Sequence, residues 1–489
     1  MRPTDRYDAT PDLAAFGRTH LVGVGGAGMS VVAELLAARG VPVQGSDARD
    51  SDVVARLREA GVPVTVGHDA AAVEGARTVV LSSAVRDDNP ELVAARARGM
   101  RVLHRSQALA ALMAGRRGVA VAGAHGKTTT SAMVATILRE LGEDPSFAVG
   151  GSVLTDFGAL PGGHLGSGDV LVAEADESDG SFLAYAPTVA LVTNVEPDHL
   201  DHYGTREAFD EAFVAFAGRV VAGGVLVACA DDPGSVALAA RHRAGGGTAW
   251  TYGTDAASDL LVEDVRTGDG ASAVLRVATP GLGGRDELVE GATAPLELRV
   301  PGAHNVLNAA GAVLACVALG AAFAAAAAAV AAFRGTGRRF EARGEAGGVR
   351  VVDDYAHHPT EITALLTAAR AVVGDGRLVV LFQPHLYSRT RAFADGFARA
   401  LALADEVVVT GVYAAREDLD PTTNARTITD LLPATTSGAA PHAVEDRIEA
   451  ARTAAGLARP GDLLLTVGAG DVTELGAVVL ETLRSRAGV

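Results

Sequence analysis

The segment VAVAGAHGKTTT, residues 119–130, joins a short apolar run to a glycine-rich turn and the start of a helical pattern. The apolar run, residues 119–122, predicts a strand, and residues 128–141 predict a long helix. A turn of this kind binds phosphate, because backbone N–H groups at the helix N-terminus face the anion. The segment therefore predicts an α/β domain that holds a nucleotide.

The match to the GxxxxGK[ST] pattern is incomplete, because Val121 stands where the first glycine belongs. The chemistry still fits a nucleoside triphosphate with Mg²⁺, since the lysine can meet the β- and γ-phosphates and the threonine hydroxyl can bind the ion. Lys127 is the only lysine among 42 lysine and arginine residues, which indicates that this position needs a compact ammonium group. We expect the phosphates to contact Gly123, His125, Gly126, Lys127, Thr128 and Thr129.

The composition limits the class of protein. With 489 residues, the chain is long enough for about three domains. Hydrophobic residues at 48% and charged residues at 21% indicate a soluble globular protein. The net charge of −17 repels phosphate backbones, which argues against a general nucleic-acid binder. Cys229 and Cys316 are the only cysteines, so there is no disulfide framework, and a cytoplasmic location is expected.

Two segments bear on a membrane location. Residues 1–18 are mixed in charge and lack the apolar core of a secretory signal, so we interpret them as a short tail. Residues 306–333 carry no charge and are long enough to cross a bilayer. Their bulk is alanine, broken by Gly311 and Gly320, which supplies little insertion energy. This segment therefore predicts two packed helices and no membrane span.

Short apolar runs alternate with helical patterns on both sides of the central segment, which is typical of doubly wound parallel sheets. We predict three α/β domains: a Rossmann-like domain over residues 1–117, a central P-loop-type domain with a parallel sheet over 118–333, and a C-terminal Rossmann-like domain over 334–489. A polar, glycine-rich stretch over residues 245–300 looks antiparallel. The other predicted strands are residues 20–24, 41–45, 78–85, 100–104, 170–173, 189–193, 349–353, 378–382, 406–410 and 462–467.

The first predicted strand runs into GVGGAGMS, residues 23–30. Gly23, Gly25 and Gly28 have a GxGxxG spacing, and Asp47 ends the next strand. Such glycines let the backbone approach a pyrophosphate, and the carboxylate could bond a ribose hydroxyl. The pattern fits a nicotinamide cofactor equally well, and the glycines could also serve only a tight turn. It predicts a diphosphate site without identifying the ligand.

Acidic residues follow the next two strands of the central domain. The run EADESD begins at Glu174, directly after a predicted strand, where a nucleotide-binding sheet holds its metal. Asp176, Glu177 and Asp179 could equally form a solvated loop. The run NVEPDH ends at His199, whose neutral imidazole could bind a second divalent ion.

Polar clusters later in the chain lie where ligands of α/β domains bind. Asn305 and Asn308 open the first alanine-rich helix and could contact adenosine or cap that helix. Arg338 and Arg339 could reach γ-phosphate oxygens. Two further clusters follow predicted strands, DDYAHHP at residues 353–359 and QPHLYSR at residues 383–389.

Taken in order, these motifs resemble the Mur ligase family. The resemblance extends from about Thr19 to Asp471 and closely matches the alanine-adding branch. It implies a UDP-binding domain, a central ATPase domain and a C-terminal domain that closes over ATP and admits the amino acid. The matching motifs are GVGGAGMS, AHGKTTT, EADESD, NVEPDH, HNVLN, GTGRRF, DDYAHHPTEI and FQPHLYSRT.

The resemblance implies that ATP phosphorylates the lactyl carboxylate of UDP-N-acetylmuramate and that L-alanine attacks the acyl phosphate. The implied UDP-substrate contacts are Gly23, Gly25, Gly26, Gly28, Met29, Ser30, Asp47 and Ser83. The implied catalytic residues are Lys127, Glu174, His199, Arg339 and Asp354. Asn305, Asn308, Arg339 and Asp354 would contact ATP. Two Mg²⁺ ions would lie at Thr128, Glu174 and His199. Tyr355, His357 and Arg389 would lie near the alanine.

The chain departs from the family pattern at two positions. Ala124 stands where relatives usually have threonine, and Leu386 replaces a common arginine, so recognition of the alanine carboxylate depends more on Arg389. Other branches bridge two metals with a carbamoylated lysine, which a chain with a single lysine at position 127 cannot do. The oligomeric state is left open.

Three other functions are weighed against an alanine-adding ligase. A recycling ligase would join a preformed peptide to the same UDP-sugar. An NAD(P)-dependent oxidoreductase would use the first glycine motif but would leave the GKT turn unexplained. A regulatory nucleotide-binding protein would bind ATP without forming an acyl phosphate.

Overall fold

The computed structural model describes residues 10–156, 158–197, 200–279, 289–415 and 417–487. The chain forms two compact units. The first comprises Met1–Val265, Ala273–Glu297 and Val306–Phe333, and the second comprises Arg266–Ser272, Leu298–Asn305 and Arg334–Val489. The predicted limits of the three domains stay predictions.

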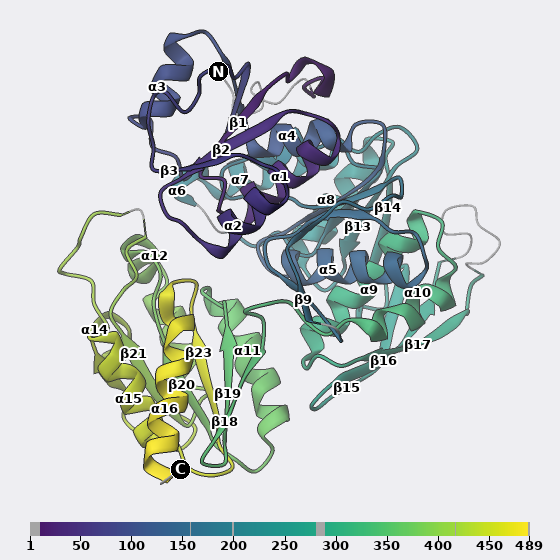
Figure 1. The fold of residues 1–489 in the computed structure, drawn as a ribbon. Helices are drawn as coiled ribbons and strands as arrows, with labels where there is room; N and C mark the ends of the chain where they lie inside the picture. Colours follow the sequence, from purple (N-terminus) through teal and green to yellow (C-terminus); the bar gives the residue numbers. More distant parts are fainter. Residues whose placement is uncertain (1–9, 157, 198–199, 280–288, 416, 488–489) are drawn as a thin grey trace. The chain divides into compact units, whose positions relative to one another are not determined.

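The N-terminal sheet of the first unit is parallel, with strand order β3-β2-β1-β4-β5. This order places the first strand in the middle, where it leads into the glycine motif, as in one half of a dinucleotide-binding fold. The predicted strands of this region are confirmed, with ends that differ by a few residues. Figure 1 labels β1 (Thr19–Val22), β2 (Val43–Asp47), β3 (Val64–Val66), α1 (Ala27–Ala38), α2 (Asp52–Glu59), α3 (Pro90–Ala97) and α4 (Arg105–Met113). The other two strands of this sheet are β4 (Thr78–Leu81) and β5 (Arg101–His104).

A buried polar cluster lies inside this N-terminal region. The Glu91 carboxylate is fully buried and accepts hydrogen bonds from Ser46 Oγ (2.7 Å). It also contacts His20 Nε2 (2.9 Å) and His68 Nδ1 (3.1 Å). Burial alone would raise the pKa of Glu91, but the contacts with His20, Ser46 and His68 hold it below its ordinary value. The ionised carboxylate therefore connects the start of α3 to β1 and β2.

Replacing Glu91 with glutamine is expected to lower the free energy of unfolding by about 3 kcal/mol at pH 7.5, because buried partners lose a charged acceptor. Since folding lowers the pKa, the stabilisation is present above the unfolded value of 4.5 and is lost as the pH falls. Thermal unfolding of both proteins from pH 7.5 to 4 should show the difference shrinking. Glu59→Gln, at an exposed end of α2, is the control. A difference that is constant with pH would contradict this prediction.

The central sheet of the first unit has the strand order β10-β7-β11-β6-β12-β13-β14-β15-β16-β17 over the described residues. β6 (Arg117–Ala122) pairs in parallel with β11 (Val170–Glu174) and β12 (Val189–Val192). Their carboxyl ends therefore meet at one edge of the sheet. The other strands are β7 (Ser146–Ala148), β10 (Gly163–His164), β13 (Val225–Cys229), β14 (Thr248–Gly253), β15 (Leu260–Thr267), β16 (Ala271–Val277) and β17 (Thr293–Leu298), with a separate hairpin of β8 (Val153–Thr155) and β9 (Gly158–Leu160).

The predicted antiparallel stretch over residues 245–300 is wrong at its start. β14 pairs in parallel with β13, and its end pairs in parallel with the start of β15. The reason is the crossover helix α8 (Pro233–Ala244), which returns the chain so that β14 runs in the same direction as β13.

The alanine-rich segment forms two helices, as predicted. α9 (Ala303–Ala318) and α10 (Phe323–Ala329) are separated by a turn in which Gly320 has a φ of 112°. No helix among the described residues is both long and apolar enough to span a bilayer. The remaining helices of this region are α5 (Lys127–Glu140), α6 (Leu200–Tyr203) and α7 (Arg206–Ala217), with short 3₁₀ turns at Ser181–Ala184 and Val330–Ala332.

The second unit contains a sheet of order β18-β19-β23-β20-β21-β22, in which β18 alone is antiparallel to its neighbour among the described strands. One core packs α11, α13 and α14 on the sheet, and another packs α15 and α16. The elements are β18 (Glu341–Ala346), β19 (Val349–Asp354), β20 (Leu378–Phe382), β21 (Glu406–Thr410), β22 (His442–Val444), β23 (Leu463–Val467), α11 (Pro359–Val373), α12 (Tyr387–Ala392), α13 (Ala394–Leu401), α14 (Arg426–Thr429), α15 (Arg447–Leu457) and α16 (Leu475–Ala487).

Candidate active site

The glycine turn after β6 adopts backbone conformations that only glycine takes easily. Gly126 is the N-cap of α5 with a φ of 82°, and Gly123 has a φ of 135°. A Cβ atom on Gly123 would lie 2.1 Å from Thr193 Oγ1. Because α5 begins at Lys127, its first amides face the space above the turn, where they can bind phosphate oxygens.

Two residues at the end of β12 hold this turn in place. Asn194 accepts a hydrogen bond from His125 N (3.0 Å) and donates one to His125 O (3.0 Å). Thr193 Oγ1 donates to the same carbonyl oxygen at 2.6 Å. The sequence reading concentrated on His199 in this motif and missed Asn194. A polar amide directly after an apolar strand was the available signal.

Lys127 makes three contacts within the first unit. Its Nζ donates to Gly123 O (2.7 Å) and Ala124 O (3.3 Å), and it lies 2.9 Å from the Glu177 carboxylate. Burial alone would lower the pKa of this ammonium group, but the charges of Glu177, Asp176 and Glu174 raise it above the ordinary value. Lys127 is therefore a permanent cation at the phosphate turn.

Thr128, in the first turn of α5, contacts Glu174, the last residue of β11. Thr128 Oγ1 donates to Glu174 Oε2 at 2.9 Å, and Gly150 N donates to the same oxygen at 2.8 Å. A hydroxyl and a carboxylate in contact form a hard-oxygen donor pair, which suits Mg²⁺. His199, the third predicted ligand, lies outside the described residues.

The acidic run after β11 is not the solvated loop that was the alternative interpretation. Glu177 is fully buried, and burial raises the pKa of its carboxyl to about 7, against the effect of Lys127. Asp176 contacts Arg105 NH2 at 3.3 Å. Asp179 accepts a short hydrogen bond from Ser83 Oγ and lies 3.5 Å from His104 Nε2. The run thus connects the phosphate turn to the N-terminal sheet.

Asp47 holds the turn of the N-terminal glycine motif in shape by a hydrogen bond to its backbone. Gly25 N donates to Asp47 Oδ2 (2.8 Å) and Arg49 N donates to Asp47 Oδ1 (3.1 Å), so the carboxylate organises the turn itself. Gly23 has a φ of 72°, and the Arg105 guanidinium lies beside Gly28. Gly26 is the N-cap of α1, whose first turns contain the buried Met29 and Ser30.

The two predicted adenosine residues belong to different units. Asn308, in the first unit, lies against the phosphate turn, because a Cβ on Gly126 would come 2.7 Å from its Oδ1. Asn305, in the second unit, donates from Nδ2 to Pro301 O at 2.7 Å.

Thr129, one of the predicted phosphate contacts, is buried in the first turn of α5.

Within the second unit, Asp354 is the last residue of β19 and Tyr355 follows it. Asp354 accepts hydrogen bonds from Phe340 N (2.8 Å) and Ala356 N (2.7 Å), and burial raises the pKa of its carboxyl to about 6. The Tyr355 ring has the guanidinium carbons of Arg338 and Arg339 at 4.8 and 5.1 Å from its centroid. Arg338 also donates to Gly468 O (2.7 Å), so it supports the loop after β23.

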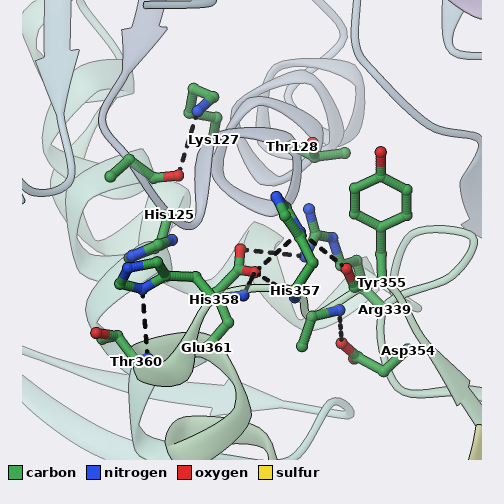
Figure 2. Close-up of polar contacts among 12 residues, drawn as sticks. His125, Lys127, Thr128, Arg339, Asp354, Tyr355, His357, His358, Thr360 and Glu361 are labelled. Carbon is green, nitrogen blue, oxygen red and sulfur yellow. Dashed lines mark hydrogen bonds and ion pairs between the residues drawn. The ribbon is translucent and has the colours of Figure 1, made fainter. Parts of the chain in front are cut away.

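Glu361, which the sequence reading missed, organises the start of α11. Its carboxylate accepts from His357 N (2.8 Å) and lies 3.2 Å from His357 Nδ1. It also lies 3.7 Å from Arg339 NH1 (Figure 2). His358 and Glu361 form a capping box, which the spacing H-x-x-E could have indicated. Arg389 is buried in α12, and Leu386 before it has a φ of 68°.

Replacing Gly126 with alanine is expected to raise the KM for ATP about 10- to 100-fold. The alanine would have to adopt the φ of 82° at this position, which a Cβ disfavours, and its Cβ would lie 2.7 Å from Asn308 Oδ1. The matched control is Gly142→Ala, where φ is 79° and no described residue lies within 4 Å of the added Cβ. Steady-state kinetics of both variants should show a change in KM only at position 126. Equal kinetics in the two variants would contradict the assignment of the turn at Gly126 as the phosphate-binding turn.

Three family models match consecutive parts of the chain. They are described as the Mur ligase family catalytic domain, the Mur ligase middle domain, and the Mur ligase glutamate ligase domain, and they match residues 18–117, 121–316 and 338–470. The chain belongs to the Mur ligase family.

This Mur ligase is similar to two proteins named UDP-N-acetylmuramate–L-alanine ligase. The protein of Kineococcus radiotolerans is 56% identical over 98% of each chain, and that of Paenarthrobacter aurescens is 51% identical over 96% of this chain and 98% of its own. A solved UDP-N-acetylmuramate-alanine ligase of Thermotoga maritima has a TM-score of 0.76 at 31% identity, covering 96% of this chain and 99% of its own. A murein peptide ligase of Psychrobacter arcticus has a TM-score of 0.70 at 26% identity, with the same coverage. The predicted α/β fold class is confirmed.

Proposed function

We propose that this Mur ligase joins L-alanine to the lactyl carboxylate of UDP-N-acetylmuramate with ATP, as a step of peptidoglycan precursor synthesis. The observation that carries the proposal is a pair of contacts: Thr128 with Glu174, at the end of β11, and Lys127 with Glu177, three residues further on. The choice of L-alanine rests on relatives of that name at 51 to 56% identity over nearly the whole chain.

In the proposed reaction, the γ-phosphoryl group passes to the lactyl carboxylate and ADP leaves. The amine of L-alanine then attacks the acyl phosphate, and phosphate departs from the tetrahedral intermediate. Lys127 offsets the negative charge of the transferring group. Amides at the start of α5 orient the phosphates.

Two Mg²⁺ ions are part of this proposal. Thr128 Oγ1 and Glu174 Oε2 offer hard oxygen ligands that are already in contact, and His199 is proposed as a further ligand. When bound, Mg²⁺ would neutralise charge on the phosphate oxygens. In the chain itself, Gly150 N fixes the Glu174 carboxylate in this position.

The other ligand contacts are also proposals. We assign the UDP moiety to the turn of Gly23, Gly25 and Gly28, which Asp47 holds in shape. In the second unit, Arg339 and Asp354 contact the nucleotide. Tyr355, His357 and Arg389 contact the amino acid. Both cysteines are free and buried, which fits a cytoplasmic enzyme.

The test is phosphate release from ATP with UDP-N-acetylmuramate and one acceptor at a time. We expect release with L-alanine at least about 100-fold faster than with a tripeptide, with glycine and serine as steric comparisons. Faster release with the tripeptide would favour a recycling ligase. ATP binding without any phosphate release would indicate a regulatory protein.

A further inference from the structure

Each of the three N–H donors of the Lys127 ammonium group has an acceptor nearby in this structure. An ammonium group has three N–H donors, and Gly123 O, Ala124 O and the Glu177 carboxylate are three acceptors within 3.3 Å. Both carboxylate oxygens of Glu177 lie 2.9 Å from Nζ. A phosphate oxygen that binds Lys127 must therefore replace one of these acceptors or share a donor with it.

Glu177 is the acceptor whose replacement has electrostatic consequences. Its side chain is fully buried, while that of Lys127 is 14% exposed. The backbone oxygen of Glu177 accepts hydrogen bonds from Gly180 N (3.0 Å) and from the Tyr203 hydroxyl. The neighbouring Asp176 is held by Arg105 and by Ser178 N (3.0 Å). These contacts hold the backbone around Glu177, from which its carboxylate reaches the ammonium group.

From this geometry we propose that Glu177 is a positioning residue that holds the Lys127 ammonium in the nucleotide-free enzyme and competes for it with the terminal phosphate of ATP. The inference rests on the proposed function, since it assumes that Lys127 binds that phosphate. Because the buried anion faces the same cation as the phosphate, its charge lowers the affinity for ATP. It also keeps the lysine side chain in place until the nucleotide arrives.

The experiment measures the Kd of a non-hydrolysable ATP analogue and of ADP by calorimetry at pH 8, above the pKa of about 7 of the Glu177 carboxyl. Glu177→Gln keeps the size of the side chain and a carbonyl acceptor for Nζ but removes the charge. We expect it to bind the ATP analogue about 5- to 50-fold more tightly than the parent protein does, with a smaller change for ADP. Glu177→Asp, which keeps the charge, should bind the analogue nearly as the parent does. Glu207→Gln, at an exposed position of α7, is the control.

A double-mutant cycle separates this effect from a general loss of negative charge. In the Lys127→Ala background, Glu177→Gln should no longer tighten binding of the analogue. Unchanged or weaker binding in Glu177→Gln, or tightening that persists without Lys127, would overturn the inference. Failure of the parent protein to bind the analogue would instead count against the proposed function. Thermal unfolding identifies a variant that does not fold, and if Glu177→Gln does not fold, Glu177→Ala, which also removes the charge, takes its place in the comparison.

Discussion

Lys127→Ala is expected to lower kcat for ADP formation by about 1,000-fold or more, because the variant loses the cation that offsets charge on the transferring phosphoryl group. The binding of UDP-N-acetylmuramate should change little, since the glycine motif at residues 23–30 is formed by other elements of the chain. Stopped assays of ADP formation, with calorimetry for the UDP-substrate, measure both quantities.

The Lys127→Ala protein should still fold. Removing the lysine leaves the Glu177 carboxyl buried without its cation, but the pKa of this group is already about 7 and would rise further, so it can become neutral at little cost. Thermal unfolding at pH 6 and pH 8 checks this. Lys127→Arg is the matched charge control, and we expect it to be impaired as well, because a planar guanidinium does not fit the two carbonyls of the turn. Normal turnover of Lys127→Ala would refute the assignment of this residue.

Glu174→Gln is expected to lower kcat by about 100- to 1,000-fold and to raise the Mg²⁺ concentration needed for half-maximal rate. The glutamine carbonyl can still accept hydrogen bonds from Thr128 Oγ1 and Gly150 N, so the local structure should be retained while the charge is lost. A titration of activity with Mg²⁺ at saturating ATP measures both effects.

Glu140→Gln is the matched control for Glu174, because Glu140 is exposed at the last turn of α5. It should have the kinetics and the Mg²⁺ dependence of the parent protein. A Glu174→Gln enzyme with an unchanged Mg²⁺ requirement would show that this carboxylate does not hold the ion. The pair Thr128 and Glu174 would then be a structural hydrogen bond only.

The central strands could be predicted because they are buried on both faces. β20, with the sequence LVVLF, has five buried positions and reads as a continuous apolar run. β18, with the sequence EARGEA, could not be predicted in this way. Among the described strands it pairs with β19 alone, and four of its six positions are exposed, so its sequence carries no apolar pattern.

Residues of the candidate site could be predicted where their side chains stand in a known motif. They were missed where their role depends only on their position in the folded chain, as for Asn194 and Glu361. Lys127 and Glu174 stand in recognisable motifs, and the structure brings their neighbours Thr128 and Glu177 into contact with them. The burial of Glu177 depends on Tyr203 and Lys127, which lie 26 and 50 residues away in the sequence. The same acidic run read alone is indistinguishable from a solvated loop.

The solitary lysine also determines how the molecule responds to covalent labelling. Acylating reagents form amides with unprotonated primary amines, and Lys127 carries the one side-chain amine of the chain. That amine is held protonated among carboxylates and is largely enclosed. The outer surface, where arginine supplies the positive charge, therefore offers no side-chain amine to such reagents, and any side-chain amide that forms reports on opening of the nucleotide turn.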